Sequence, residues 1–202
     1  PDRPAYEDAV RRIDGISNRW FLDPVFGRGY PSDVVEDVRS TSALEFVRDG
    51  DTDVIAAPID FLGVNYYTRH VVAPAAYPGS AGVEFLSRGF PVTAMGWEVD
   101  PDGLYDVLRR VHDDYPAVPI VVTENGSAFE DVMGADGTVQ DEELLAYLRD
   151  HLGAIARLIA DGVDLRGYFA WSLMDNFEWA YGYDKRFGIV HVDYDTQVRT
   201  PK

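Results

Sequence analysis

Apolar residues recur at helical spacing in four stretches of the chain. The stretch 141–160, for example, has Leu145, Leu148, Leu152, Ile155 and Ile159 on one side, and this spacing predicts an amphipathic helix. Acidic residues at 141–143 form its first turn, where the helix dipole favours negative charge, and Asp161-Gly162 ends it. The predicted helices are 6–21, 33–47, 101–113 and 141–160.

Between the helices lie short apolar runs bounded by Gly, Pro or Asp, which predict buried strands. The runs are 59–64, 118–123 and 165–173, and a fourth strand is predicted at 188–194 with a hairpin arm near Val198. Strands that alternate with helices predict βα units and a parallel sheet. The loops that follow the first two strands, 68–100 and 125–140, are long, whereas the returns from helix to strand are short. We therefore expect the functional site at the carboxyl ends of the strands.

Composition excludes several classes of protein. The 202 residues are 46% hydrophobic, which is too apolar for intrinsic disorder. The net charge of −17 disfavours nucleic-acid backbones and anionic membrane surfaces as partners, and no apolar run is long enough to span a membrane. Without Cys, disulfides and thiolate metal sites are excluded. No targeting signal is visible, so we predict a cytoplasmic location.

Polar and aromatic residues gather at the predicted strand ends. Glu124 follows an apolar strand, which suits a nucleophile or an acid/base group, although a loop cap or a partner for Arg gives the same pattern. Glu178 lies between two aromatics, which fits either a sugar-binding platform or a packed amphipathic segment. A Tyr at the position of Tyr67 is more often a core aromatic than a catalytic partner, and Asn65 needs hydrogen-bond partners if it is buried. The four His lack metal-ligand spacing, and no dinucleotide-binding glycine motif is present.

Five segments together closely resemble glycoside hydrolase family 1, the β-glucosidase family. They are NRWFLDP at 18–24, FLGVNYY at 61–67, VTENG at 122–126, GYFAWSLMDNFEW at 167–179 and GYDKRFGIVHVD at 182–193. The resemblance covers essentially the whole chain. It implies a (β/α)8 TIM barrel of the α/β class and a retaining mechanism without a metal or other cofactor.

The resemblance also implies roles for individual residues. Glu124 would be the nucleophile, and Tyr67 its hydrogen-bond partner. The substrate-binding residues would be Asn65, Trp97, Trp171, Glu178, Trp179 and Phe187, and a cis peptide is implied between Trp171 and Ser172. A subgroup that cleaves phosphorylated sugars has Ser at the position of Glu178. We therefore expect small unphosphorylated β-glucosides or cello-oligosaccharides as substrates, with fucosides and galactosides secondary.

One expected part is missing. The family carries its acid/base Glu in an Asn-Glu-Pro motif, which this sequence lacks. We expect residues 1–202 to be the C-terminal portion of one barrel domain, roughly strands 6 to 8 with their helices and long loops. The missing N-terminal half would then be a required partner, in the same protein or in another chain. Two alternatives stay open: a carbohydrate-binding or regulatory module without catalysis, and a fragment of a 6-phospho-β-glycosidase.

Overall fold

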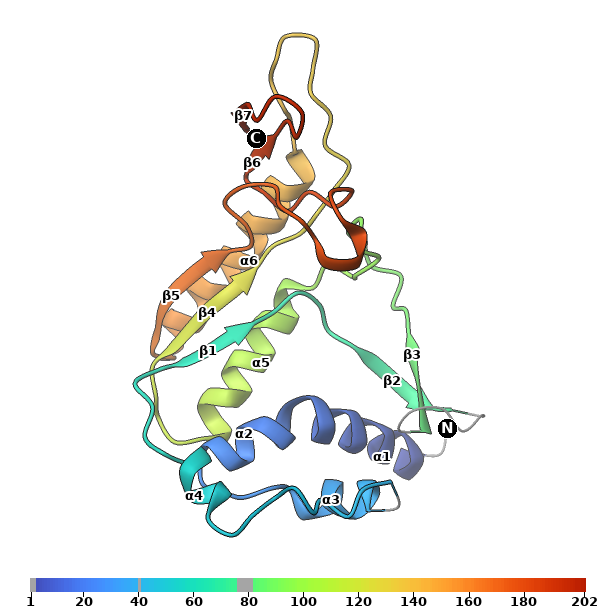
Figure 1. The fold of residues 1–202 in the computed structure, drawn as a ribbon, viewed down its shortest axis with the longest axis vertical. Coiled ribbons are helices and arrows are strands. Elements are labelled where there is room, and N and C mark those ends of the chain that lie inside the picture. Colours follow the sequence, from blue (N-terminus) through green and yellow to red (C-terminus); the bar gives the residue numbers. More distant parts are fainter. Residues whose placement is uncertain (1–2, 40, 76–81) are drawn as a thin grey trace. The chain divides into compact units, whose positions relative to one another are not determined.

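The computed structural model describes residues 3–39, 41–75 and 82–202 (Figure 1). The chain forms two compact units. The first contains Pro1–Ile59 and His70–Ser87, and the second contains Asp60–Arg69 and Arg88–Lys202. Among the described residues, no helix combines the length and the apolar character that crossing a membrane requires.

The first unit consists mainly of helices and a two-stranded ribbon. Its elements are α1 (Arg3–Asp14), a π-helical turn (Gly15–Arg19), α2 (Trp20–Val25), α3 (Ser32–Val38), α4 (Asp51–Ile55), β2 (Val71–Pro74) and β3 (Val83–Leu86). Ala9 of α1 packs with Val72 and Val83 of the antiparallel ribbon, and Ile13 covers this small core. The helix predicted over 6–21 is confirmed, and it continues through the π-helical turn into α2.

The helix predicted over 33–47 is wrong in its second half, because α3 ends at Val38. Side-chain hydroxyls bond the backbone beyond this point. The Thr41 hydroxyl donates to the carbonyl of Val38 at 2.9 Å, and Ser42 Oγ accepts from the amide of Leu44 at 3.2 Å. Such local bonds compete with helix continuation. Leu44 and Val47 are therefore spaced as in a helix but do not lie in one.

The ribbon of β2 and β3 lies where the sequence predicts only a loop, 68–100. Val71 pairs with Leu86, and Pro74 pairs with Val83. Each strand has only four residues, so neither shows a clear period on its own. The pairing and the packing on α1 stabilise them. Residues 76–81 of the predicted loop lie outside the described residues.

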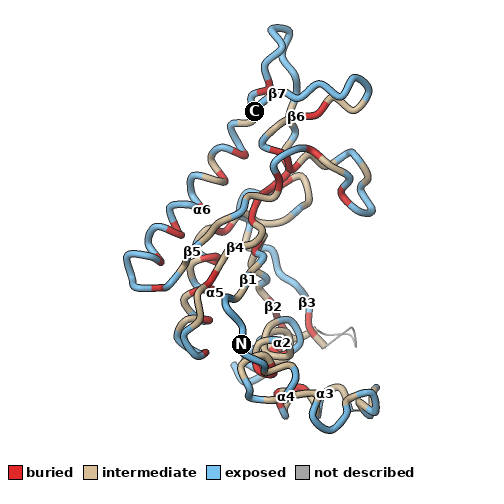
Figure 2. The backbone as a smooth tube through the Cα atoms, turned by 60° about the vertical axis from the view of Figure 1, so that its left-hand side comes forward, coloured by how far each residue is buried: buried red, intermediate tan, exposed pale blue. Residues whose placement is uncertain are grey.

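The second unit contains the parallel sheet and its helices (Figures 1 and 2). Its main elements are β1 (Leu62–Asn65), α5 (Pro101–Asp114), β4 (Ile120–Asn125), α6 (Glu142–Ala160) and β5 (Leu165–Ala170). The strand order is β1-β4-β5 with every pair parallel, as predicted. Asp100 caps α5 through the amide of Gly103, and Asp141 caps α6 through the amide of Leu144. The predicted helix starts are thus confirmed.

The two faces of this sheet differ in exposure. On one face, Ile120 and Val122 are buried, as are Leu108 of α5 and Leu158 of α6, and the two helices pack against each other. Other apolar residues in or beside the strands are instead exposed, including Phe61 just before β1 and Phe169 within β5. No described part of the second unit buries these rings.

The fourth predicted strand is confirmed as half of a hairpin. Its strands β6 (Val190–Val192) and β7 (Arg199–Pro201) pair antiparallel. The return arm begins one residue after Val198. Because the backbone amide of Lys202 also donates to the carbonyl of Ile189 at 3.1 Å, the hairpin bonds extend beyond β7.

A buried polar network lies behind β4. The side-chain Nδ2 of Asn125 donates to the backbone carbonyl of Tyr66 at 2.7 Å and to the hydroxyl of Tyr147 at 2.9 Å. The side-chain Oδ1 of Asn125 accepts from the hydroxyl of Tyr168 at 2.8 Å. Burial raises the pKa of Tyr168 to about 12, so this hydroxyl keeps its proton. One fully buried amide thereby ties β4 to the ends of β1 and β5 and to α6.

His151 of α6 should make the stability of this unit depend on pH. The buried ring stacks on Tyr147, and its Nδ1 donates to the carbonyl of Tyr147 at 2.8 Å. Burial lowers the pKa of His151 from 6.5. The unfolded chain therefore binds this proton more readily, and the stabilisation should be complete above pH 6.5 and be lost as the pH falls toward the folded-state pKa. We expect the urea midpoint of the wild type to fall more between pH 7 and pH 5 than that of His151→Gln. Equal falls would contradict this role for His151.

Candidate active site

The polar residues predicted at the strand ends lie together. Asn65 of β1 pairs in register with Glu124 of β4, and the register shifts at this point in both β1–β4 and β4–β5. Such irregularities redirect side chains at the end of a strand. The hydroxyl of Thr123 donates to the side-chain oxygen of Asn65 at 2.7 Å. Asn65 is exposed, so burial does not require this partner, but its side-chain oxygen has one.

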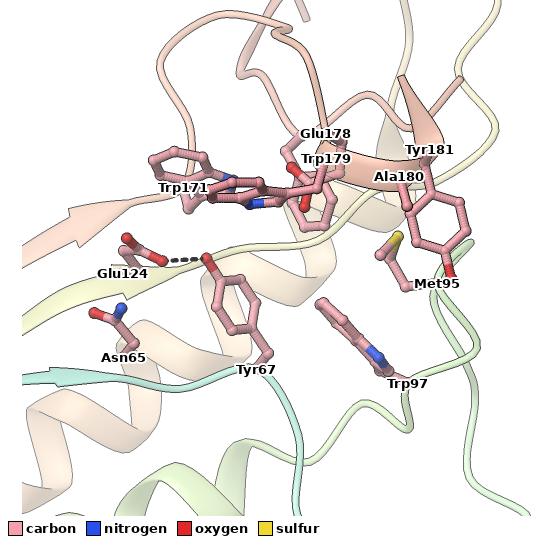
Figure 3. Close-up of a pocket in the computed structure, with 11 residues that line it drawn as sticks. Asn65, Tyr67, Met95, Trp97, Glu124, Trp171, Glu178, Trp179, Ala180 and Tyr181 are labelled. Atoms are coloured by element: carbon pink, nitrogen blue, oxygen red, sulfur yellow. Dashed lines mark hydrogen bonds between the residues drawn. The ribbon is translucent and has the colours of Figure 1, made fainter. Parts of the chain in front are cut away.

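Glu124 is held by Tyr67. The hydroxyl of Tyr67 donates to Glu124 Oε2 at 2.7 Å, as Figure 3 shows. Burial raises the pKa of Tyr67, and its hydrogen bond to Glu124 raises it further. The tyrosine therefore keeps its proton and donates to a carboxylate. This bond fixes one Glu124 oxygen and leaves the other available at the mouth of the strand.

Both residues line a cavity of about 540 Å³, which is the size of an ordinary small-molecule site. Its lining contains all eight residues predicted for the site: Asn65, Tyr67, Trp97, Glu124, Trp171, Glu178, Trp179 and Phe187. Three further lining residues are Met95, Ala180 and Tyr181. Met95 and Tyr181 lie two residues from Trp97 and Trp179, so the aromatic segments could have indicated them. Ala180 offered no comparable signal.

Aromatic rings form much of this cavity. The Tyr67 and Trp97 rings have centroids 5.2 Å apart, and Phe187 lies 6.3 Å from each. In Figure 3, Trp171 and Trp179 lie above the bond between Tyr67 and Glu124, whereas Trp97 lies below it. Flat apolar rings pack well on the C–H faces of a sugar ring. The cavity thus combines aromatic walls with carboxylates.

Glu178 is the second carboxylate of the cavity, and only 8% of the residue is exposed. Among the described residues, its Oε2 has no hydrogen-bond partner. A buried acceptor without a partner is costly, and a ligand that donates hydroxyl groups removes that cost. Trp179 beside it is 82% exposed and has a φ of 45°. This segment therefore presents an acceptor and an open indole face.

Gly126 is required where β4 leaves the sheet. A Cβ at this position would lie 1.8 Å from the backbone oxygen of Trp171, and the backbone there cannot move freely because the amide of Trp171 donates to the carbonyl of Asn125. We expect Gly126→Ala to lower the free energy of unfolding by about 3 kcal/mol or more. Urea denaturation of the chain measures this.

Gly153 provides the matched control. It lies within helix α6, and a Cβ added there would have no neighbouring atom within 4 Å outside the helix's own backbone. Gly153→Ala should stabilise the chain by about 0.5–1 kcal/mol. Equal effects of the two substitutions would contradict the close approach of Gly126 to Trp171. The cis peptide implied between Trp171 and Ser172 is present in the structure.

The model of glycosyl hydrolase family 1 matches residues 1–202. The chain belongs to this family. It is 47% identical to a bifunctional β-D-glucosidase/β-D-fucosidase of Bifidobacterium breve, over 96% of this chain and 46% of that relative. It is also 47% identical to β-glucosidase A of Thermotoga maritima, over 96% of this chain and 43% of that relative. The family 1 chain thus spans less than half the length of these relatives.

Solved structures agree with this assignment. The psychrophilic β-glucosidase of Micrococcus antarcticus superposes with a TM-score of 0.94 at 47% identity, covering 100% of this chain and 47% of that one. A β-glucosidase of Exiguobacterium marinum gives 0.95 at 40% identity, covering 100% and 46%. These neighbours are α/β TIM barrels, and the family 1 chain is a partial piece of that fold. Another similar structure is a β-glucosidase from Thermotoga maritima in complex with castanospermine.

Proposed function

We propose that this chain is the nucleophile-bearing part of a retaining β-glucosidase, which releases terminal non-reducing β-D-glucosyl residues. The observation that carries the proposal is the Tyr67–Glu124 hydrogen bond, at 2.7 Å, inside an aromatic cavity at the ends of parallel strands. Membership of glycosyl hydrolase family 1 supports it. The β-glucosidase names of the relatives support the substrate class.

In the proposed reaction, the free oxygen of Glu124 attacks the anomeric carbon of the glucoside. The bond to the leaving-group oxygen breaks, and that oxygen takes a proton from a second carboxyl group. Water then attacks the glycosyl-enzyme ester, gives its proton to the same second group and releases Glu124. Tyr67 would hold the nucleophile in position during both steps.

The remaining cavity residues would bind the sugar. Trp171 would stack beneath the glucose ring, while Glu178 and Trp179 would bind its hydroxyls. Asn65 and Phe187 would close the same pocket, and Trp97 would face the leaving group. The unpartnered Oε2 of Glu178 supports its assignment as a hydroxyl acceptor.

We propose further that the chain corresponds to strands 6 to 8 of the barrel and works only with the N-terminal half. A retaining glycosidase needs a second carboxyl group about 5–5.5 Å from the nucleophile, and the motif that supplies it in the family is absent here. The sheet order leaves one edge of β1 and one edge of β5 unpaired among the described residues. The exposed rings of Phe61 and Phe169 are apolar surface that further strands would cover.

The test uses a complete barrel, made by joining this chain behind the part of the Bifidobacterium breve relative that it does not cover. We expect this protein to hydrolyse an aryl β-glucoside and to discriminate against the aryl 6-phospho-β-glucoside, because the carboxylate of Glu178 repels phosphate. Glu178→Ser should shift the ratio of the two kcat/KM values toward the phosphorylated substrate. The exposed Glu130 gives the control, since Glu130→Ser should leave the ratio unchanged.

A preference for the phosphorylated substrate would favour the 6-phospho-β-glycosidase alternative. Binding of glucosides to the complete barrel without any turnover would favour the carbohydrate-binding module. Either result would overturn the proposed function.

A further inference from the structure

The loop that follows β5 supplies more of the cavity than any strand does. Residues 171–189 contribute six of the eleven lining residues, from Trp171 to Phe187. Regular structure in this loop is limited to one 3-10 turn, Trp179–Tyr181, and an isolated parallel bridge from Met174 to Val190. Other contacts must therefore hold Glu178 and Phe187 in place.

Asp175 joins the beginning of this loop to its end. Its fully buried carboxylate accepts from the amides of Gly188 at 2.9 Å and Val192 at 3.1 Å, and from Arg186 Nη1 at 2.6 Å. Phe187 lies between two of these donors. Asp175 thus holds the backbone that follows Phe187 and the side chain of the residue that precedes it.

The ammonium of Lys202 lies next to Asp175 and two further carboxylates. Lys202 Nζ is 2.7 Å from Asp131, 3.4 Å from Asp175 and 3.6 Å from Asp141, and every one of these side chains is at most 3% exposed. Asp131 precedes helix α6, and Asp141 caps it. Lys202 therefore links the β5 loop to the loop and helix that follow Glu124.

The charges of this cluster explain why the link should matter. Three carboxylates share two cations, Lys202 and Arg186. Removing one partner of a buried ion pair leaves an uncompensated charge, which is strongly destabilising. A ring nitrogen of His191 lies within 4.8 Å of carboxylate oxygens of Asp131 and Asp175, a grouping that metals also use. Here the ammonium of Lys202 already supplies the positive charge.

We propose that Lys202 and Asp175 are positioning residues of the sugar pocket. Their buried ion pair holds the loop 171–189 against the β4–α6 loop, in the shape that presents Glu178 and Phe187 to the glucose. The role in substrate binding rests on the proposed function, whereas the role in loop order does not.

Hydrogen exchange on the 202-residue chain tests loop order. In Lys202→Met, which keeps the length of the side chain but removes its charge, the amides of Gly188 and Val192 should exchange at least tenfold faster. The amide of Val122 in β4 should keep its protection. Arg199→Met is the matched control, because Arg199 lies on β7 three residues before Lys202 but is exposed, and it should leave all three rates unchanged.

A second variant keeps the test decisive if Lys202→Met unfolds the whole chain. Asp131→Asn combined with Lys202→Met removes one charge of each sign. It should fold, and the amide of Gly188 should exchange at a rate between those of the wild type and Lys202→Met. Exchange as slow as in the wild type in both variants would overturn the proposal.

Kinetics of the complete barrel test the effect on substrate. A disordered sugar-binding loop weakens binding more than chemistry, so Lys202→Met should raise KM for an aryl β-glucoside about tenfold and change kcat less than about threefold. A fall in kcat with KM unchanged would overturn the role in substrate binding. If the parent barrel has no turnover, the proposed function fails, while the exchange rates still decide whether Lys202 orders the loop.

Discussion

Glu124→Gln is expected to abolish glucosidase turnover of the complete barrel while leaving its fold intact. The amide has nearly the size and shape of the carboxylate, and it can still accept the 2.7 Å hydrogen bond from Tyr67. It cannot, however, form the covalent intermediate. Loss of a catalytic nucleophile costs roughly 10⁴–10⁶-fold in kcat. Initial rates on an aryl β-glucoside, with circular dichroism as the check on folding, measure this.

The matched control for Glu124→Gln is Glu130→Gln, because Glu130 follows the same strand but is exposed. This variant should keep the parent kcat and KM. Turnover by Glu124→Gln at the level of the Glu130→Gln control would refute Glu124 as the nucleophile. A comparable loss in both variants would instead indicate a general effect of charge on this loop.

The second large effect concerns the 202-residue chain by itself, which we expect to show no turnover of an aryl β-glucoside. The chain holds Glu124 but lacks the family's acid/base motif, so it has no acid to protonate the leaving group and no base to activate the water that must release the glycosyl-enzyme. The same chain joined to the N-terminal part of its relative should be active. Parallel assays at equal concentration, with the Glu124→Gln complete barrel as the blank, make the comparison.

Measurable turnover by the purified chain, above that blank, would contradict the need for the missing half. The exposed rings of Phe61 and Phe169 predict one further difference between the two proteins. Unpaired strand edges beside exposed apolar surface promote association. The isolated chain should therefore aggregate at lower concentrations than the complete barrel, which light scattering detects.

Much of the second unit could be predicted from the sequence, because its local signals agree with its tertiary contacts. The apolar run at 118–123 and the helical spacing of apolar residues over 101–113 and 141–160 predicted β4, α5 and α6 with small errors at the ends. The first unit was less predictable. There α3 ends at Val38 because hydroxyl groups bond the backbone, and β2 and β3 are stabilised by pairing with each other and by packing on α1.

The cavity was predicted mainly because its residues fall in recognisable segments. Asn65, Glu124 and Trp171 lie at or just after the carboxyl ends of three strands, so parallel pairing alone brings them to one edge of the sheet. The role of Lys202 was not predicted. Its three carboxylate partners lie 27 to 71 residues away in the chain, and only the folded loops bring them together.

Covalent trapping of the complete barrel tests the central proposal most directly. A 2-deoxy-2-fluoro β-glucoside with a good leaving group slows hydrolysis of the glycosyl-enzyme, so the intermediate accumulates and can be located by peptide mass spectrometry. The nucleophile assignment predicts one adduct per chain, on Glu124, that is absent from Glu124→Gln and present in Glu130→Gln. An adduct on Glu178 instead, or no adduct on a barrel that binds the compound, would contradict it.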